Sequence, residues 1–302
     1  MPLSSQSAHV EEPWLQFQTP SVRHLAFSLC SPDILASIPS ELNIVHAFEL
    51  KPQNHWLTHF HHYYQRLVYL DNHPEELENF LAQLKSTRLG LRFEMLIWFW
   101  LLDDAYHPYR LLGHSIQQID GAVTLGELDF LVLNSQTGET EHWEVALKYY
   151  LGEGHLSLPQ WYGLNRSDTL LRKLNHFTHK QFQFKQVGNH QIDRHFAVMK
   201  GQLYLPQSSH ENLTLPTWLN QERRMGLWGT DIPDQQNLHR LKRHEWICPE
   251  KENSSTFCKW WTNGLYFQPD KALFYMFRNK PLISSIRHDC FQTLIEKQHF
   301  IT

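Results

Sequence analysis

Cysteine is scarce in this chain of 302 residues, and none of it is arranged in pairs. No two cysteines have the CxxC spacing of a zinc site or a redox motif. The pattern indicates reduced, mostly buried thiols. The four cysteines are Cys30, Cys248, Cys258 and Cys290.

Long apolar runs are also missing. The longest is MLIWFWLL, at residues 95–102, whereas a membrane-spanning helix needs about 20 such residues. We therefore expect no transmembrane helix. The first residues, MPLSSQSAHVEEP, have neither the basic segment nor the apolar segment of an export signal, so we expect a cytoplasmic protein.

Glycine is sparse, at 13 residues, and the glycine-rich phosphate-binding loops are missing. Without GxxxxGK[ST] or GxGxxG, the sequence gives no support for ATP or dinucleotide binding, and without GxSxG none for a serine hydrolase elbow. An excess of positive charge is missing as well, because 27 Lys and Arg stand against 31 Asp and Glu. This balance excludes a generally basic nucleic-acid binder but leaves room for a local basic groove.

What is present is a globular composition, with 41% hydrophobic and 19% charged residues. Residues 1–20 are polar, and we expect a loose arm there. Residues 21–87 read as a helical region, with a helix beginning at Ser31 and Pro32 and an apolar helical face across residues 56–70. A further helix is expected at residues 73–85.

The spacing of apolar residues along the chain changes after residue 88. Residues 88–104 predict a helix that is apolar almost all round and therefore buried. Strands are then predicted at residues 111–119, 126–134 and 142–151, a helix at 166–182 and a strand at 195–205. Residues 142–151 could also form a helix with Glu144 and Lys148 paired, but the short preceding turn favours a hairpin. The order is α-β-β-β-α-β, which makes this an α/β protein.

Residues 206–302 indicate an irregular α+β region packed on that core. Short strands are expected at RRMGLWGT, HEWIC and FCKWW, and a last helix near residues 281–297.

Two carboxylates stand in otherwise apolar strands of the predicted hairpin. They are Asp129 in GELDFLVL and Glu144 in HWEVALKYYL, and Lys148 follows Glu144. Adjacent strands can bring such carboxylates to one edge, where one or two of them suffice to hold Mg²⁺. The alternative is that both are edge charges and that Lys148 is their ion-pair partner.

Glu94 favours the functional-site interpretation over the edge-charge alternative. It is the lone acid in FEMLIWFWLL, an almost wholly apolar helix. A carboxylate in that position is either buried with a partner or part of an active site.

With Glu94, Asp129, Glu144 and Lys148, this order of elements resembles the PD-(D/E)XK nuclease superfamily, whose pattern GEIDLI…FVEVK is similar to GELDFLVL…HWEVALKYYL. TPSVRHLAFSLCSPDIL, RLGLRFEMLIWFWL and WYGLNRSDTLLRKLNHFTHKQ further resemble the domain-of-unknown-function 1853 family. The resemblance covers residues 19–205. It implies a restriction-endonuclease-like core at residues 88–205 and a metal site of Glu94, Asp129 and Glu144 holding Mg²⁺, with Mn²⁺ as a substitute. Lys148 would assist catalysis.

One departure from the superfamily pattern concerns the lysine. The pattern separates acid and lysine by two residues, whereas Glu144 and Lys148 are four apart, about 13 Å along an ideal strand. Ala146 stands where the acid would be expected. A bulge near Ala146 or Leu147, or a lysine bent back toward Glu144, would restore the geometry.

The helix after the hairpin is basic. Five Lys and Arg between residues 166 and 185 face a single acid, Asp168, which favours a phosphate-backbone partner. A solvated basic face is the plainer alternative. The resemblance implies that this helix supplies a basic or amide residue to the site, with Lys173 and Gln181 in position. The candidate nucleic-acid-binding residues are Arg166, Arg172, Lys173, Lys180 and Gln181.

Two further patterns give weaker evidence of a binding site. His55, His59 and His62 share a helix face and could hold zinc, but no fourth ligand stands in a motif with them. The aromatic residues Trp260, Trp261, Tyr266 and Phe267 could stack on bases, although core packing explains them better.

The leading hypothesis is a Mg²⁺-dependent phosphodiesterase acting on nucleic acid, on DNA rather than RNA. The alternative is a catalytically inactive, nuclease-derived module that binds nucleic acid or protein. A third reading is a helical interaction protein whose carboxylates are structural. Nucleases that cut both strands are often dimers, and the sequence leaves the oligomeric state open.

Overall fold

The computed structural model describes residues 12–121, 123–210, 213–233, 238–250 and 261–280. Its helices are α1 (Pro20–Cys30), α2 (Gln53–Asn72), α3 (Glu75–Leu81), α4 (Leu89–Leu102) and α5 (Leu170–His179). Its longer strands are β2 (Tyr109–Asp120), β3 (Val123–Asn134), β4 (Thr140–Gly152) and β8 (Arg194–Pro206). The shorter strands are β1 (Glu49–Leu50), β5 (Trp161–Tyr162), β6 (Gln186–Val187), β7 (His190–Gln191), β9 (Gly226–Gly229), β10 (His239–Arg240), β11 (Gly264–Gln268) and β12 (Leu273–Phe277).

One large mixed sheet organises the described chain. Ten strands belong to it, and its main path runs β10-β11-β12-β9-β8-β4-β3-β2. The strands β2, β3 and β4 pair antiparallel, while β4 and β8 pair parallel. The crossover from β4 to β8 carries α5, as a parallel pair requires. The predicted order of α4, three strands, α5 and β8 is therefore present.

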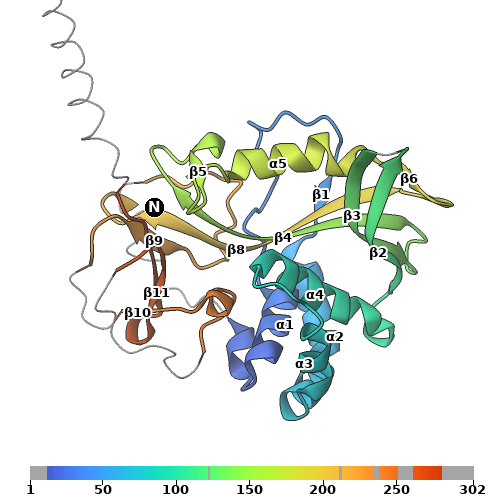
Figure 1. Cartoon of the computed structure of the whole chain (residues 1–302), viewed down its shortest axis with the longest axis horizontal. Coiled ribbons are helices and arrows are strands. Elements are labelled where there is room, and N and C mark those ends of the chain that lie inside the picture. The colour runs from blue at the N-terminus through green and yellow to red at the C-terminus, as the bar shows by residue number, and fades with distance from the viewer. Residues whose placement is uncertain (1–11, 122, 211–212, 234–237, 251–260, 281–302) are drawn as a thin grey trace, which may run out of the picture.

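Helices cover both faces of this sheet. Figure 1 shows α1 to α4 on one side and α5 on the other. Successive side chains of β4 point to opposite faces of the sheet, so this strand packs against both layers. Val145 and Leu147 pack with the α1–α4 layer. Ala146 and Tyr150 pack with α5. Residues 142–151 are thus a strand, and Glu144 and Lys148 lie on the face toward α5 by the same alternation.

The helical face predicted for residues 56–70 is confirmed in α2, where Trp56, Phe60, Tyr63, Leu67 and Leu70 are buried. The helix predicted to begin at Ser31 is wrong. Helix α1 ends at Cys30, and the chain then crosses to the sheet, where Ile34 N donates to Met199 O at 2.8 Å. A local Ser-Pro-Asp signal is overridden here by a contact with a strand far along the sequence.

The expected loose arm is wrong for the part that the structure describes. Residues 12–20 pack on the helical layer, with Trp14 and Phe17 each only 2% exposed. Residues 1–11 lie outside the described residues. Large aromatic side chains at these two positions explain the packing, because burying each of them removes a large apolar surface from water.

The described part of the C-terminal region has more strands than expected. Strands β9 to β12 continue the central sheet beyond β8, with β9 parallel to both β8 and β12. The strand predicted at RRMGLWGT is β9, whereas HEWIC contains a 3₁₀ helix (Arg243–Trp246) instead of a strand. The helix expected near residues 281–297 and most of FCKWW lie outside the described residues.

No helix among the described residues is both long enough and apolar enough to cross a membrane.

Candidate functional site

The site begins where strands β3 and β4 stop pairing. Their ladder ends at the pair Phe130–Trp143. At the next position, hydrogen bonds from backbone N–H groups to side-chain carboxylates connect the two strands. Val145 N donates to Asp129 Oδ2 at 2.8 Å, and Asp129 N donates to Glu144 Oε1 at 3.3 Å. The two carboxylates predicted from the sequence are therefore brought together at the opening of the hairpin.

Glu144 is held from three directions. Its side chain is 1% exposed. His142 Nε2 lies 2.8 Å from Oε1, and Gln181 Nε2 donates to Oε2 at 2.7 Å and to Glu127 O at 3.1 Å. Burial raises the pKa of Glu144 to about 7, against the hydrogen bond from Gln181, which favours the ionised form. These contacts fix the orientation of the carboxylate, and its raised pKa lies near neutral pH.

Asp129 is perturbed in the same direction as Glu144. Burial raises its pKa well above the ordinary value, and the negative charges of Glu144 and Glu94 raise it further. Glu94 reaches the same neighbourhood from α4, where its Oε1 lies 2.8 Å from His114 Nε2 and accepts a weaker bond from Ser115 at 3.4 Å. The three predicted acids thus form one electrostatically coupled cluster.

Lys148 does not join this cluster through the geometry that we expected. Its Nζ donates to both carboxylate oxygens of Asp168, at 3.1 and 2.8 Å, and Tyr150 OH bonds the same carboxylate. Strand β4 pairs with β8 without any register shift, so the expected bulge near Ala146 or Leu147 is absent. The lysine side chain has a nearer anion than Glu144, and the strand stays regular.

Lys173 is the cation that faces the carboxylates. Burial lowers its pKa, while the charges of Glu144 and Asp129 oppose that shift. Its Nζ also lies 4.0 Å from the centre of the Phe177 ring. The sequence predicted that Lys148, on the strand, would supply a positive charge near the carboxylates. In the structure Lys173, from α5, supplies it.

Helix α5 has one buried side and one open side. Thr169 caps it by accepting a hydrogen bond from Arg172 N, and Leu170, Leu174 and Phe177 are buried at helical spacing. The open side lines a groove of about 680 Å³ formed by Ser167, Asp168, Arg172, Lys173, Asn175, His176 and His179.

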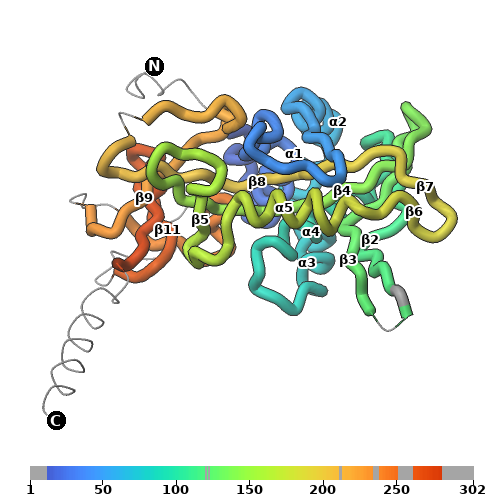
Figure 2. Tube along the Cα trace, turned by 90° about the horizontal axis from the view of Figure 1, so that it is seen from above, coloured from blue at the N-terminus to red at the C-terminus, as the bar shows by residue number. Residues whose placement is uncertain are grey.

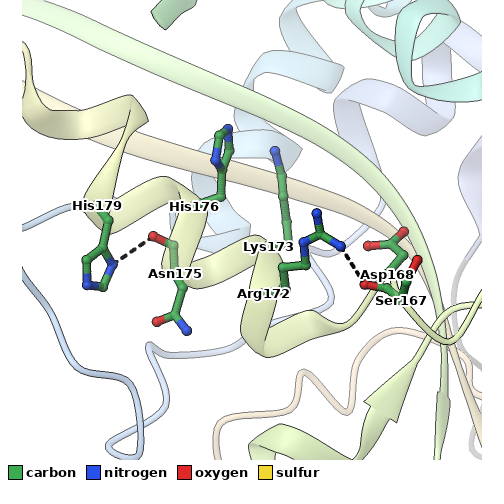
Figure 3. Close-up of a pocket in the computed structure, with 7 residues that line it drawn as sticks. All are labelled: Ser167, Asp168, Arg172, Lys173, Asn175, His176 and His179. Atoms are coloured by element: carbon green, nitrogen blue, oxygen red, sulfur yellow. Dashed lines mark hydrogen bonds between the residues drawn. The ribbon is translucent and has the colours of Figure 1, made fainter. Parts of the chain in front are cut away.

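Figure 3 shows how the groove residues divide. Lys173 and His176 point to the same side of α5, whereas Arg172 turns back toward the start of the helix, where it donates to Ser167 O. His179 bonds Asn175 O at 2.9 Å. The groove thus offers several hydrogen-bonding groups and the cations Arg172 and Lys173, and Lys173 connects it to the carboxylate cluster.

The remaining candidates of this helix region differ in their surroundings. Arg166 lies before α5, pairs with Glu153 and packs over the Tyr162 ring at 4.1 Å. Lys180 is exposed at the C-terminal end of α5. Gln181 reaches Glu144, the position that the resemblance implied for an amide. The helix itself is shorter than predicted, because Thr169 provides the cap in place of Arg166.

Sequence reasoning missed His142, Asp168, His176 and His179. His142 is two residues before Glu144, so strand alternation alone would have placed both on one face. His176 and His179 follow Arg172 at helical spacing, and that signal was also available. In the sequence, Asp168 is the single acid of the basic region at residues 166–185. The spacing along the chain does not indicate that Lys148 is its partner.

The other metal hypothesis finds no support in the structure. His55 and His59 contact each other with ring centres 4.5 Å apart within an aromatic core, whereas His62 is exposed. Burial lowers the pKa of His55 to about 2 and that of His59 to about 4. Within the described ranges no group of three or more His, Cys, Asp or Glu is arranged to hold a metal ion.

The remaining motifs are structural where they are described. Trp261 stacks on Tyr266 with ring centres 4.0 Å apart, and Tyr266 is fully buried, as core packing predicts. Trp260 lies outside the described residues. Cys30 and Cys248 are free and buried. Cys258 and Cys290 lie outside the described residues.

The donor set of the cluster suits a hard divalent cation held by few protein ligands. Mg²⁺ is commonly bound through one or two carboxylates, with water and substrate oxygens completing its octahedron. Asp129 engages its backbone neighbour through Oδ2, and among the described residues no hydrogen bond reaches Oδ1. The mutual repulsion of Glu94, Asp129 and Glu144 is the other feature that a cation would relieve.

Fold and site together define a mixed α/β protein with a coupled carboxylate cluster at a strand opening, faced by a basic helix. Comparison with protein families assigns the chain more narrowly. It belongs to the family described as Domain of unknown function (DUF1853), whose pattern matches residues 23–268. Comparison with the curated proteins and with the solved structures gives no match.

Proposed function

We propose that this protein is a metal-dependent phosphodiesterase of the PD-(D/E)XK type that hydrolyses nucleic acid, DNA rather than RNA. The order of α4, β2, β3, β4, α5 and β8, with β4 parallel to β8, supports a restriction-endonuclease-like core. The observation that carries the proposal is the pair Asp129 and Glu144. A buried carboxylate, Glu144, and a half-buried one, Asp129, meet at a strand opening, where desolvation raises the pKa of both.

The charge pattern around the pair fits a phosphodiester. Lys173 faces the carboxylates, and Arg172 and His176 line the groove beside them. A phosphate group entering this groove would be attracted by the charges of Lys173 and Arg172, while the acids would repel it unless a cation lay between them. The arrangement therefore favours a substrate that arrives together with a divalent metal.

Asp129 and Glu144 would hold Mg²⁺, or Mn²⁺ in its place, with Glu94 binding its waters. Such an ion neutralises phosphate charge and lowers the pKa of a bound water. Gln181 and His142 keep Glu144 oriented, each through one carboxylate oxygen. Lys173 would stabilise the negative charge that develops on the phosphate oxygens during attack by water.

Lys148 has a supporting role in this proposal. Its ion pair with Asp168 joins β4 to the turn immediately before α5 and so positions the helix that carries Lys173. Hydrolysis adds water across one P–O bond and leaves a phosphate end and a hydroxyl end. None of these steps requires the ammonium of Lys148 to leave Asp168.

The test is incubation with single-stranded, duplex and branched DNA, and with RNA, in Mg²⁺, Mn²⁺, Ca²⁺ or EDTA. Cutting with Mg²⁺ or Mn²⁺ that is lost in EDTA supports the proposal. Asp129→Asn and Glu144→Gln should each lower the rate at least 100-fold, whereas Glu139→Gln, at the far end of the hairpin, should cut like the wild type. Equal rates in all four proteins would mean that the carboxylates are not the site.

A second candidate function is a nuclease-derived module that binds nucleic acid without cutting it. The engagement of Lys148 by Asp168 favours this reading, as does the lack of a three-ligand metal group in the described parts of the chain. Salt-dependent binding to DNA with no cutting under any metal would select it.

A further inference from the structure

The carboxylate of Glu94 is contacted from strand β2. Figure 2 shows α4 beside the β2–β3 hairpin. His114 Nε2 lies 2.8 Å from Glu94 Oε1, and each of the two side chains is only 16% exposed. A carboxylate accepts hydrogen bonds and does not donate them, so the hydrogen of this bond lies on Nε2 of the imidazole. The contact is therefore a half-buried hydrogen bond with a defined direction.

Two aromatic rings fix the plane of this imidazole. Trp98 stacks on His114 with ring centres 4.1 Å apart and 24° between the planes, and Phe130 stacks on it at 4.9 Å and 27°. Two rings cannot stack on the same face at these distances, so the imidazole lies between them. Trp98 is one helical turn after Glu94 on α4, and Phe130 follows Asp129 on β3. The imidazole is thus held by both elements that carry these two acids.

The next residue of β2 departs from regular strand geometry. Ser115 has a φ of +50°, in the left-handed region that residues other than glycine seldom adopt. Successive side chains of a regular strand point to opposite faces, yet His114 Nε2 and Ser115 Oγ both contact Glu94 Oε1, the latter at 3.4 Å. The ladder between β2 and β3 places Ser115 opposite Asp129. The strained residue therefore lies at the acid cluster, and backbone strain is concentrated at functional sites.

The two carboxylate oxygens of Glu94 have different surroundings. Oε1 receives both contacts from β2, whereas among the described residues no hydrogen bond reaches Oε2. The charge of Glu94 raises the pKa of Asp129 and of Glu144, so this carboxylate lies within electrostatic reach of both acids. Oε2 is therefore the oxygen that is left to accept a hydrogen bond within the cluster.

Resting on the proposed function, we propose that His114 is a positioning residue for Glu94. It holds Oε1 so that Oε2 accepts a hydrogen bond from a water of the divalent cation that Asp129 and Glu144 would bind. Groups outside the ligand sphere orient the groups inside it, and losing one costs about 10- to 100-fold in metal affinity or activity. A hydrogen bond that only stabilised the fold would change neither metal affinity nor turnover.

The experiment measures Mn²⁺ binding to the full-length protein without DNA, from the electron paramagnetic resonance signal of free Mn²⁺, and measures DNA cutting separately. His114→Phe keeps a ring between Trp98 and Phe130 but removes the hydrogen-bond donor. It should weaken Mn²⁺ binding about tenfold and lower turnover about tenfold, with KM for DNA changed less than about twofold. His114→Gln, whose side-chain amide offers an N–H in place of the imidazole, should recover most of both losses.

The matched control is His244→Phe. It breaks a carboxylate–imidazole pair outside the cluster, in which His244 Nε2 lies 2.9 Å from Glu250 Oε1, and should bind Mn²⁺ and cut DNA like the wild type. Ser115→Val is a second variant, which leaves His114 unchanged and replaces an exposed side chain. A β-branched residue disfavours the left-handed backbone, so this variant should also weaken Mn²⁺ binding, by about threefold or more.

Three results would overturn the positioning role. If His114→Phe binds Mn²⁺ and cuts DNA like the wild type, the role is refuted and the phosphodiesterase proposal stands. If Mn²⁺ binding falls together with the melting temperature and His114→Gln recovers neither, the pair is structural. If the wild type binds no Mn²⁺, the metal site fails as well. A wild type that binds Mn²⁺ but cuts no nucleic acid refutes the proposed function alone, and weaker binding by His114→Phe with recovery by His114→Gln would still support the positioning role.

Discussion

The raised pKa of Glu144 predicts that this carboxylate lowers the stability of the folded protein as the pH rises. Its ordinary value of 4.5 applies to the unfolded chain, and burial raises the folded value to about 7. The folded state therefore holds a proton that the unfolded state has already lost. Stability from this group is fully present below pH 4.5 and is lost between pH 4.5 and pH 7.

The size of the effect follows from the shift. At about 1.4 kcal/mol for each pH unit, the rise from 4.5 to about 7 corresponds to about 3 kcal/mol. The side chain is 1% exposed, so solvent screening reduces this figure little. Other groups move the curve in the opposite direction, because burial lowers the pKa values of His55, His59 and His142 and their stabilisation is lost as the pH falls.

The assay must therefore isolate Glu144 from these histidines. We would measure the free energy of unfolding by urea denaturation from pH 5 to pH 8, in EDTA, for the wild type and Glu144→Gln. The variant cannot ionise, so it should gain about 2–3 kcal/mol relative to the wild type across that range. Glu139→Gln should show no such trend. A constant difference between wild type and Glu144→Gln would refute a buried carboxylate that takes up a proton near pH 7.

Four further outcomes are expected. Mg²⁺ at about 100 times its dissociation constant should stabilise the wild type by about 3 kcal/mol at pH 8 and should not stabilise Glu144→Gln, as thermal unfolding would measure. Lys173→Met should lower turnover more than it raises KM in the DNA-cutting assay, because its charge is needed at the transition state. Lys148→Met should cost less turnover than Lys173→Met, and the reverse ranking would return the catalytic role to Lys148. Arg172→Glu/Lys173→Glu should weaken DNA binding in all sequences and reduce the slope of log K against log salt by about 2, while an unchanged slope would mean that the helix faces elsewhere.

Local patterns predicted most of the elements that carry the candidate site. The apolar sequence of residues 88–104 predicted the buried helix α4, and alternation predicted β3 and β4. Two acids in apolar strands identified Asp129 and Glu144, because an unpaired buried carboxylate is costly and needs a reason. Their proximity then follows from antiparallel pairing, which sequence spacing describes well.

Pairings between distant segments were not predictable in the same way. Lys148 and Asp168 are separated by a loop, and the choice of Asp168 over Glu144 depends on where that loop brings the acid. Strand β9 pairs with β12 across a long intervening segment, so neither local periodicity nor turn residues signal the extension of the sheet. The same reason explains Ser31, whose helix signal yields to a contact of Ile34 with Met199.

The sequence by itself determined the main helices and strands from α4 to β8, apart from their exact ends, and which side chains are anomalous within them. These properties depend on neighbours a few residues away, through backbone geometry and the exclusion of apolar side chains from water. Only the tertiary structure decided the remaining partners of the charged groups, with Asp168 binding Lys148 and His142 contacting Glu144. Electrostatic energy depends on distance and burial in space, and chain separation specifies neither.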